Sequence, residues 1–95
     1  MQNLNAQFLR LSHLLAASRL GSLTAAAAQL GLTQPALTRS IRALEETLGL
    51  PVLTRTPRGV VPTEAGEALI AQAQVIEQAL QAARQDIERI RDSRH

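Results

Sequence analysis

The sequence predicts a mainly α-helical fold, in which three short helices and a small two-stranded hairpin precede one long helix. In three stretches of the chain, apolar residues recur at alternating steps of three and four, which is the spacing of a helix with one buried face. Two short β-prone runs flank a turn-rich segment, which is the pattern of a hairpin. This order is that of a winged helix-turn-helix, expected over residues 1–62, followed by a long helix over residues 63–95.

The first helix is expected at about residues 5–18. Its apolar stripe consists of Leu4, Phe8, Leu11, Leu14 and Leu15. Gly21 follows as the expected stop, since glycine tolerates the left-handed conformation that often follows a helix.

The second helix is expected over residues 25–30, a run whose alanines allow a close approach to neighbouring helices. Ser22 or Thr24 is expected to cap its first turn, because a hydroxyl oxygen accepts a hydrogen bond from the free N–H groups there. Gly31 is expected to end it.

The third helix begins after Thr33, another hydroxyl residue that can cap a first turn. Pro35 falls in that turn, where its missing N–H costs nothing. Gly49 and Pro51 are expected to end the helix. Its buried stripe is expected to consist of Leu37, Ile41, Leu44 and Leu48.

The hairpin is expected to pair residues 52–54 with residues 60–62, and a turn with two arginines lies between these runs. Thr63 then caps the last helix, and Glu64 places negative charge where the helix dipole favours it. This helix continues to about residue 92, a length of roughly 43 Å at ~1.5 Å per residue.

Composition and charge narrow the possible functions. The chain has no cysteine, which excludes a disulfide framework and a thiolate metal site. Arg10, His13 and Arg19 interrupt the apolar residues near the start, so no membrane-spanning segment is expected.

Residues 1–62 carry six arginines against two glutamates, whereas residues 63–95 carry four arginines against six acidic residues. The first part is therefore the expected binder of a polyanion. All ten basic residues are arginine, which suits phosphate and guanine recognition but is also what a GC-rich genome would encode.

The second and third helices have the spacing of a helix-turn-helix, whose second helix enters the major groove of DNA with its N-terminal end first. The candidate groove-facing residues lie off the apolar stripe and are Gln34, Pro35, Thr38, Arg39 and Arg42. Gln34 can form paired hydrogen bonds with adenine, and Arg39 or Arg42 with guanine or a phosphate. Pro35 and the Thr38 methyl group can contact a thymine methyl group. On spacing alone, the alternative is that this face is simply solvated.

Both helix starts are candidate phosphate sites, because backbone N–H groups there have no partner within the helix. The residues concerned are Ser22, Thr24 and Thr33. These contacts would fix the position of the protein on the duplex without reading its sequence.

Residues 23–45 resemble the N-terminal DNA-binding domain of LysR-type transcriptional regulators. The string Thr-Gln-Pro-Ala-Leu-Thr-Arg at residues 33–39 is the most specific part, and Thr-Glu-Ala-Gly at residues 63–66 also matches. The resemblance implies a winged helix-turn-helix, a linker helix that pairs two chains and usually a C-terminal effector domain. It implies base and groove contacts for Gln34, Pro35, Thr38 and Arg39. It also implies backbone or minor-groove contacts for Arg55 and Arg58 in the wing, whose alternative interpretation is a flexible surface tip.

The last helix carries a heptad seam of apolar residues, here called the α-seam. It consists of Leu69, Ala73, Ile76, Leu80, Ala83, Ile87 and Ile90. A domain of about sixty residues cannot cover such a long seam, so pairing with a second chain is expected, and packing back on the first helix is the alternative. The seam leaves parallel and antiparallel pairing open, whereas the resemblance implies the antiparallel one. Such a dimer would bind an inverted repeat with half-sites about one turn, ~34 Å, or a multiple of it apart.

The sequence therefore predicts a homodimer that binds double-stranded DNA sequence-specifically and regulates transcription in the bacterial cytoplasm, at the nucleoid. No catalytic set, cofactor or metal site and no membrane contact is expected. His13 is interpreted as a packing residue, and Glu45 and Glu46 as the solvated end of a helix. The alternatives are a non-specific architectural DNA-binding protein and a helical protein–protein interaction module.

Residues 1–95 include no counterpart of the effector domain that the resemblance implies. The chain is therefore expected to be either the DNA-binding part of a longer regulator or a naturally short one. A small-molecule inducer is expected only where an effector domain exists, and a full-length protein could form a higher oligomer.

Overall fold

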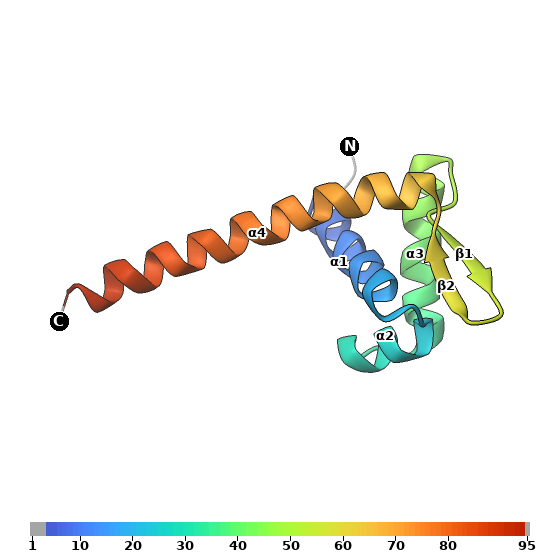
Figure 1. The fold of residues 1–95 in the computed structure, drawn as a ribbon, viewed down its shortest axis with the longest axis horizontal. Helices are drawn as coiled ribbons and strands as arrows, with labels where there is room; N and C mark the ends of the chain where they lie inside the picture. Colours follow the sequence, from blue (N-terminus) through green and yellow to red (C-terminus); the bar gives the residue numbers. More distant parts are fainter. Residues whose placement is uncertain (1–3, 95) are drawn as a thin grey trace.

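The computed structural model of the chain describes residues 4–94 (Figure 1). In that part, the helices are α1 (Leu4–Leu20), α2 (Leu23–Leu30), α3 (Gln34–Leu48) and α4 (Glu64–Asp92), and the strands are β1 (Leu53–Thr56) and β2 (Gly59–Pro62). This is the mainly α-helical winged helix-turn-helix that the sequence predicts. The last helix has the expected bounds, whereas α1 ends slightly later and α2 begins slightly earlier than expected.

The early start of α2 follows from its cap. Ser22, and not Thr24, is the N-cap, because the Ser22 hydroxyl oxygen accepts a hydrogen bond from the N–H of Ala25 at 3.1 Å. Thr33 caps α3 in the same way, through the N–H of Ala36 at 3.2 Å, as the sequence predicts. Both caps stabilise the helix starts that lie side by side in the helix-turn-helix.

The three short helices and the wing enclose a small aliphatic core. Its buried residues are Leu14, Ala17, Leu23, Ala26, Ala27, Leu37, Ile41, Leu44, Val52 and Val60. Leu48, expected on the buried stripe of α3, is 41% exposed, so the prediction is wrong at this residue. Leu48 is the last residue of α3, and an apolar stripe is covered only as far as the neighbouring elements reach. The side chain of Leu4, expected on the stripe of α1, lies outside the described residues.

The wing is an antiparallel hairpin held against the corner between α1 and α2. Thr56 pairs with Gly59 across a two-residue turn, and Val52, expected in the first strand, precedes it and is fully buried. Gly59 approaches the corner so closely that an added Cβ would lie 2.0 Å from the carbonyl oxygen of Gly21. The N–H of Val60 donates to the same oxygen at 3.0 Å. The base of the wing is therefore fixed by backbone contact.

The start of α4 is fixed on the segment that leads into the wing. The hydroxyl of Thr63 donates to the carbonyl oxygen of Pro51 at 2.6 Å and accepts from the N–H of Gly66 at 3.1 Å. A Cβ on Gly66 would lie 2.0 Å from the carbonyl oxygen of Val52, so only glycine allows this approach. The predicted Thr63 cap is thus confirmed and also anchors the helix to its neighbours.

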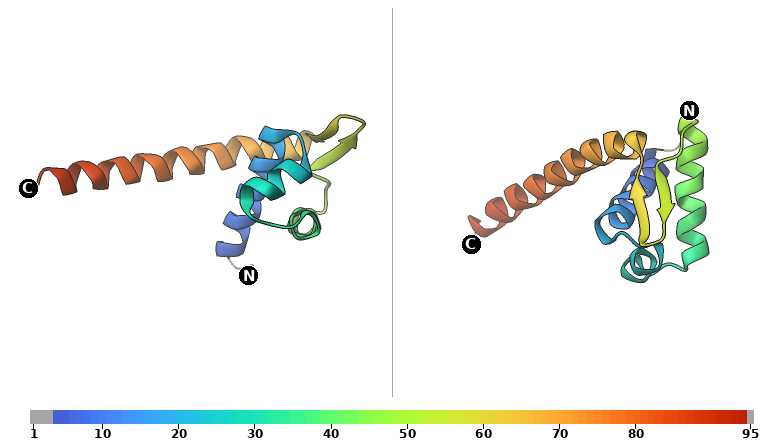
Figure 2. Two further views of the ribbon diagram at one scale, coloured as in Figure 1. Left: turned by 90° about the horizontal axis from the view of Figure 1, so that it is seen from below. Right: turned by 45° about the vertical axis from the view of Figure 1, so that its right-hand side comes forward.

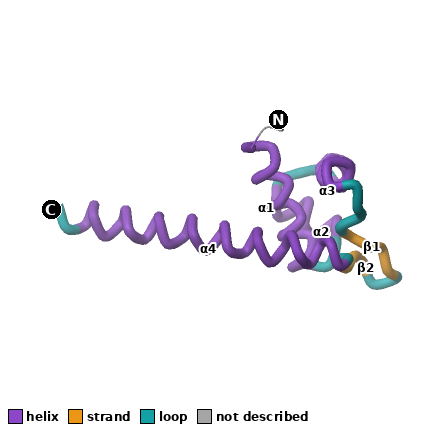
Figure 3. Tube along the Cα trace, turned by 90° about the horizontal axis from the view of Figure 1, so that it is seen from above, coloured by secondary structure: helices purple, strands orange, loops and turns teal. Residues whose placement is uncertain are grey.

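α4 packs across α1 and then projects from the body of the molecule (Figures 1 and 2). Leu69 and Ile70 pack against the core, and the Arg19 guanidinium in the last turn of α1 donates two hydrogen bonds to Glu77, of 2.7 and 3.2 Å. Beyond Glu77, every described residue of α4 is exposed. The projecting part, seen from above in Figure 3, makes the molecule long and narrow, 53 × 30 × 22 Å. Over the described residues, no helix combines the length and the apolarity needed to cross a membrane.

Candidate nucleic-acid interface

The outer face of α3 presents one continuous polar surface. A single shallow hollow of about 480 Å³ on this face is lined by Gln34, Pro35, Thr38, Arg39 and Arg42. All except the half-buried Thr38 are exposed, whereas Leu37 and Ile41 on the opposite face are buried. The structure thus brings together every residue that the sequence proposes for contact with bases.

Gln34, the first residue of α3, is held by a hydrogen bond from the neighbouring helix. The hydroxyl of Thr24, in the first turn of α2, donates to Gln34 Oε1 at 3.1 Å, and both residues are exposed. Sequence analysis missed this pairing, because neither side chain belongs to an apolar stripe. The only signal for it is a polar residue in the first turn of each helix.

The other two hydroxyl residues at the helix starts have a different role. The hydroxyl oxygens of Ser22 and Thr33 each accept an N–H from their own helix. Each hydroxyl keeps its own proton, which can still be donated to a phosphate oxygen. The first N–H groups of α2 and α3 have no partner within their helices, and the helix dipoles make both ends positive. Both ends are therefore chemically suited to phosphate.

The wing extends the polar surface of α3. Arg55 of β1 lines a small hollow of about 100 Å³ together with Thr38 and Arg42, so it adjoins the face of α3. Arg58 lies in the turn at the wing tip and is exposed. Its backbone N–H donates to the Thr56 hydroxyl at 3.2 Å, which orders the tip. The right-hand view of Figure 2 shows the hairpin alongside α3.

This surface is positive and its charges are free to bind a ligand. Among the described residues, no carboxylate forms an ion pair with Arg39, Arg42, Arg55 or Arg58. Arg19 differs, because its two hydrogen bonds to Glu77 raise the pKa of the guanidinium and lower the pKa of the carboxyl group. Arg19 therefore joins α1 to α4, whereas the four other arginines face solvent.

Glu45 has a structural role that sequence analysis missed. Its Oε2 accepts the N–H of Val52 at 2.7 Å, which ties the end of α3 to the start of the wing. The interpretation of Glu45 as part of a solvated helix end is therefore wrong, while the neighbouring Glu46 is exposed. No spacing pattern marks a carboxylate that folds back on a later segment.

The α-seam divides into two parts. Leu69 packs against the core and Ala73 is only 6% exposed. The expected place of Ala73 between two chains is corrected, because packing within this chain already buries it. The later seam residues, Leu80, Ala83, Ile87 and Ile90, are all exposed. The alternative expectation, packing back on α1, is therefore correct for the first part of the α-seam, and the later part presents an uncovered apolar face.

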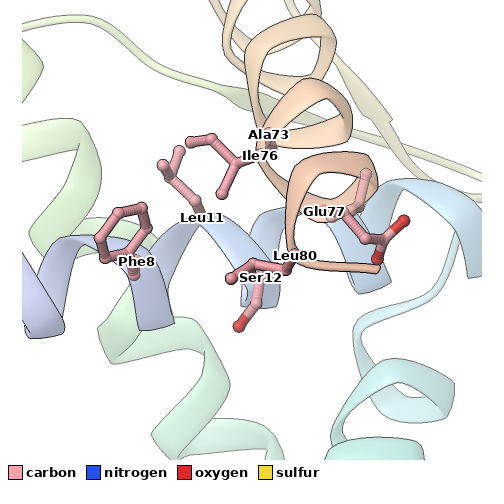
Figure 4. Close-up of a pocket in the computed structure, with 8 residues that line it drawn as sticks. Phe8, Leu11, Ser12, Ala73, Ile76, Glu77 and Leu80 are labelled. Atoms are coloured by element: carbon pink, nitrogen blue, oxygen red, sulfur yellow. The ribbon is translucent and has the colours of Figure 1, made fainter. Parts of the chain in front are cut away.

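An apolar groove of about 390 Å³ lies between α1 and α4 where the two parts of the α-seam meet (Figure 4). Phe8, Leu11 and Leu15 line it from α1, and Ala73, Ile76 and Leu80 line it from α4. Phe8 is 43% exposed, so its ring is uncovered on one side. The groove is continuous with the exposed part of the seam through Leu80.

A helix-turn-helix with a polar and basic outer face, flanked by a wing with two free arginines, defines a winged helix-turn-helix protein of the nucleic-acid-binding class. Residues 8–67 match the family described as "Bacterial regulatory helix-turn-helix protein, lysR family", and the chain belongs to this family.

Named relatives share this part of their sequences with the chain. The HTH-type transcriptional regulator PgrR of Escherichia coli (strain K12) is 58% identical over 50 residues, which are 53% of this chain and 17% of PgrR. The HTH-type transcriptional regulator CbbR of Rhizobium meliloti (strain 1021) is 41% identical over 90 residues, which are 95% of this chain and 29% of CbbR. The chain thus spans less than a third of each of these relatives.

Solved structures with this fold include domains bound to DNA. The crystal structure of the CbnR_DBD-DNA complex has a TM-score of 0.71 at 35% identity and covers 93% of this chain and 98% of its own. The crystal structure of the BenM_DBD/catB site 1 DNA complex has a TM-score of 0.80 at 31% identity and covers 93% of this chain and 95% of its own.

Proposed function

We propose that this chain binds double-stranded DNA sequence-specifically as a homodimer and regulates transcription in a bacterial cell. The observation that carries this is the outer face of α3, where the five predicted groove-facing residues line one hollow that adjoins the wing. The DNA complexes of the similar CbnR and BenM domains support DNA binding by this fold.

In this proposal the N-terminal end of α3 enters the major groove. Gln34 pairs with adenine N6 and N7, and Arg39 or Arg42 pairs with guanine O6 and N7 or holds a phosphate. Pro35 and the Thr38 methyl group pack against thymine methyl groups. The position of these side chains on one helix face, where all except the half-buried Thr38 are exposed, supports the assignment.

Contacts to the sugar-phosphate backbone come from the two helix starts and from the wing. The free N–H groups of the first turns of α2 and α3, with the hydroxyls of Ser22 and Thr33, hold phosphates beside the groove. Arg55 binds the backbone beside α3, and Arg58 reaches the backbone or the minor groove beyond it.

Two copies pair through α4. The apolar side chains of Leu80, Ile87 and Ile90 are 67%, 60% and 51% exposed, and the groove between α1 and α4 offers them a complementary surface. Burying these side chains in a second copy removes apolar area from water, at roughly 25 cal/mol per Å². With the antiparallel pairing typical of the family, the two recognition helices face an inverted repeat with half-sites one turn, ~34 Å, or a multiple of it apart.

In this proposal, two consecutive parts of the chain have different functions. Residues 1–62 contact DNA and residues 63–95 pair the chains, in the bacterial cytoplasm at the nucleoid. The role is regulatory rather than enzymatic, because the named relatives are transcriptional regulators. A small-molecule inducer would act through an effector domain outside residues 1–95.

Selection of bound duplexes from a random DNA pool, at near-physiological salt, tests the proposal. We expect enrichment of an inverted repeat, which also supplies the operator. Binding without enrichment would instead support an architectural protein, whose affinity depends on salt rather than sequence. No binding by a dimeric chain would support a protein–protein interaction module and overturn the proposal.

A further inference from the structure

We propose that Thr24 is a specificity-determining positioning residue, which holds the Gln34 side chain in the orientation that reads a base. The inference rests on the proposed function and concerns the same surface. It starts from the hydrogen bond that Thr24 Oγ1 donates to Gln34 Oε1 at 3.1 Å, which crosses from α2 to α3.

The hydrogen-bonding capacity of the two groups fits this role. An amide oxygen has two lone pairs and an amide nitrogen has two protons. When Thr24 occupies one lone pair of Gln34 Oε1, the second lone pair and both Nε2 protons stay free. Adenine needs one acceptor for its N6 amino group and one donor for N7, and Gln34 can still provide both.

Without such a bond, the amide of Gln34 has no fixed direction. Gln34 is exposed at the first position of α3, and glutamine is among the side chains with the largest loss of rotamer entropy on ordering. A free amide can also rotate to present its donors to guanine or its acceptor to cytosine. Fixing its rotation before binding reduces the entropic cost of base contact and excludes the wrong orientations.

Thr24 is a suitable anchor because the start of α2 is itself held in place. The preceding Leu23 is buried in the core, and the Ser22 cap closes the first turn through Ala25. The Thr24 hydroxyl therefore occupies a defined position although its side chain is exposed.

The same bond limits what the Thr24 hydroxyl can do at the start of α2. A threonine hydroxyl has a single proton, and Thr24 donates it to Gln34. It cannot donate the same proton to a phosphate oxygen at the same time. Phosphate contact at the start of α2 then belongs to the backbone N–H groups and to Ser22.

A comparison of variants of the full 95-residue chain tests the inference. Thr24→Val keeps the shape of the side chain and removes the hydroxyl, whereas Thr24→Ser keeps the hydroxyl. Both are made alone and together with Gln34→Ala, and each protein selects from the same random duplex pool at the same salt concentration. Circular dichroism melting confirms that each variant is folded.

We expect Thr24→Val to reduce the base preference at the position read by Gln34 by about 2- to 10-fold, the range of one net hydrogen bond. Thr24→Ser should retain the preference. In the Gln34→Ala background, Thr24→Val should have no further effect on base preference, because the residue acts through the glutamine.

Three outcomes would overturn the inference. If Gln34→Ala changes base preference but Thr24→Val does not, Thr24 has no positioning role while the proposed function stands. If Thr24→Val weakens binding to all sequences equally, with base preference unchanged, Thr24 contacts phosphate rather than positioning Gln34. If Gln34→Ala itself leaves every base preference unchanged, the base-reading role proposed for Gln34 fails, and the positioning role fails with it.

Discussion

The buried His13 connects α1 to α3, the helix proposed to enter the major groove. Its Nδ1 lies 2.7 Å from the hydroxyl oxygen of Ser40 on the inner side of α3, and the side chain is only 7% exposed. Burial lowers the pKa of His13, because the imidazolium loses its hydration inside the protein. The interpretation of His13 as a packing residue is thus confirmed, and the structure adds a hydrogen bond and a titration to it.

This environment predicts a pH-dependent stability. Since the pKa of His13 is lower in the folded than in the unfolded chain, the unfolded chain binds more protons near pH 6.5. The free energy of unfolding should be constant above that pH and fall as the pH drops below it, with a slope of at most about 1.4 kcal/mol per pH unit for one proton. Urea denaturation between about pH 5 and pH 8 measures this slope.

The matched control for this titration is His13→Gln, which cannot take up a proton in this range but can still hydrogen-bond Ser40. Its stability should be flatter over the same interval. An identical slope in both proteins would assign the dependence to other groups. Arg19 lowers the pKa of the Glu77 carboxyl, so titration of this group would change the stability only below about pH 4.5, outside the measured interval.

A second prediction at the residue scale concerns Gly59. Gly59→Ala should destabilise the chain by about 2–5 kcal/mol, since a φ of +136° strains any side-chain residue and the new Cβ meets the Gly21 carbonyl at 2.0 Å. Gly31→Ala is the control, because it has positive φ but nothing within 4 Å, and should cost about 1–2 kcal/mol. Thermal melts of both variants compare them. Equal losses would show that the close approach of the wing to the corner contributes nothing.

At the scale of single elements, most of the helical structure could be predicted from local pattern. Hydroxyl caps at Ser22, Thr33 and Thr63 and glycine stops at Gly31 and Gly49 follow from short-range chemistry, so the bounds of α3 and α4 agree with expectation. The errors at Leu48 and Ala73 have a different origin. Burial at the end of a stripe depends on which distant element lies over it, and this information is not local.

The candidate interface shows the same limit. Helical periodicity alone places Gln34, Thr38 and Arg42 on one face, because residues four positions apart lie above one another. The hydrogen bonds from Thr24 to Gln34 and from Val52 to Glu45 could not be predicted. Each depends on the distance between two separately packed elements, which the core determines.

The recognition helix and the wing should differ in what they contribute to binding. Gln34→Ala should remove about 1–3 kcal/mol of binding free energy for the base that Gln34 reads. The preference for that base at this position of the DNA should therefore be relaxed. Arg58→Ala should weaken binding to all sequences similarly and reduce the magnitude of the salt slope by about 0.9, as expected for one lost phosphate contact. Titrations of the selected operator and a scrambled duplex at several salt concentrations separate these effects. Uniform weakening by Gln34→Ala would contradict its base-reading role.

At the scale of the whole molecule, the direction of α4 determines how the DNA-binding surfaces of two paired chains would lie relative to each other. α4 is anchored at its start by Thr63 and Gly66 and farther along by the Arg19–Glu77 pair. Because these contacts fix its first half on the body, the exposed half projects from the body as part of one continuous helix (Figure 1). Pairing two such helices places two recognition surfaces at a fixed separation, which is what an inverted repeat with set spacing requires.

The pairing surface can be tested without disturbing the core. Replacing both Ile87 and Ile90 with Lys places two charges where apolar contact is proposed, and both residues are at least half exposed, so the single chain should stay folded. Sedimentation velocity should then show monomers. Affinity for the full inverted repeat should fall by about 100-fold or more, because the second half-site is no longer bound by a linked partner.

Val75→Lys is the matched control, since Val75 is 57% exposed but lies off the α-seam. It should leave the dimer intact, and a dimer that persists in the Ile87/Ile90 variant would show that pairing does not depend on these two residues, and would contradict their place in the interface.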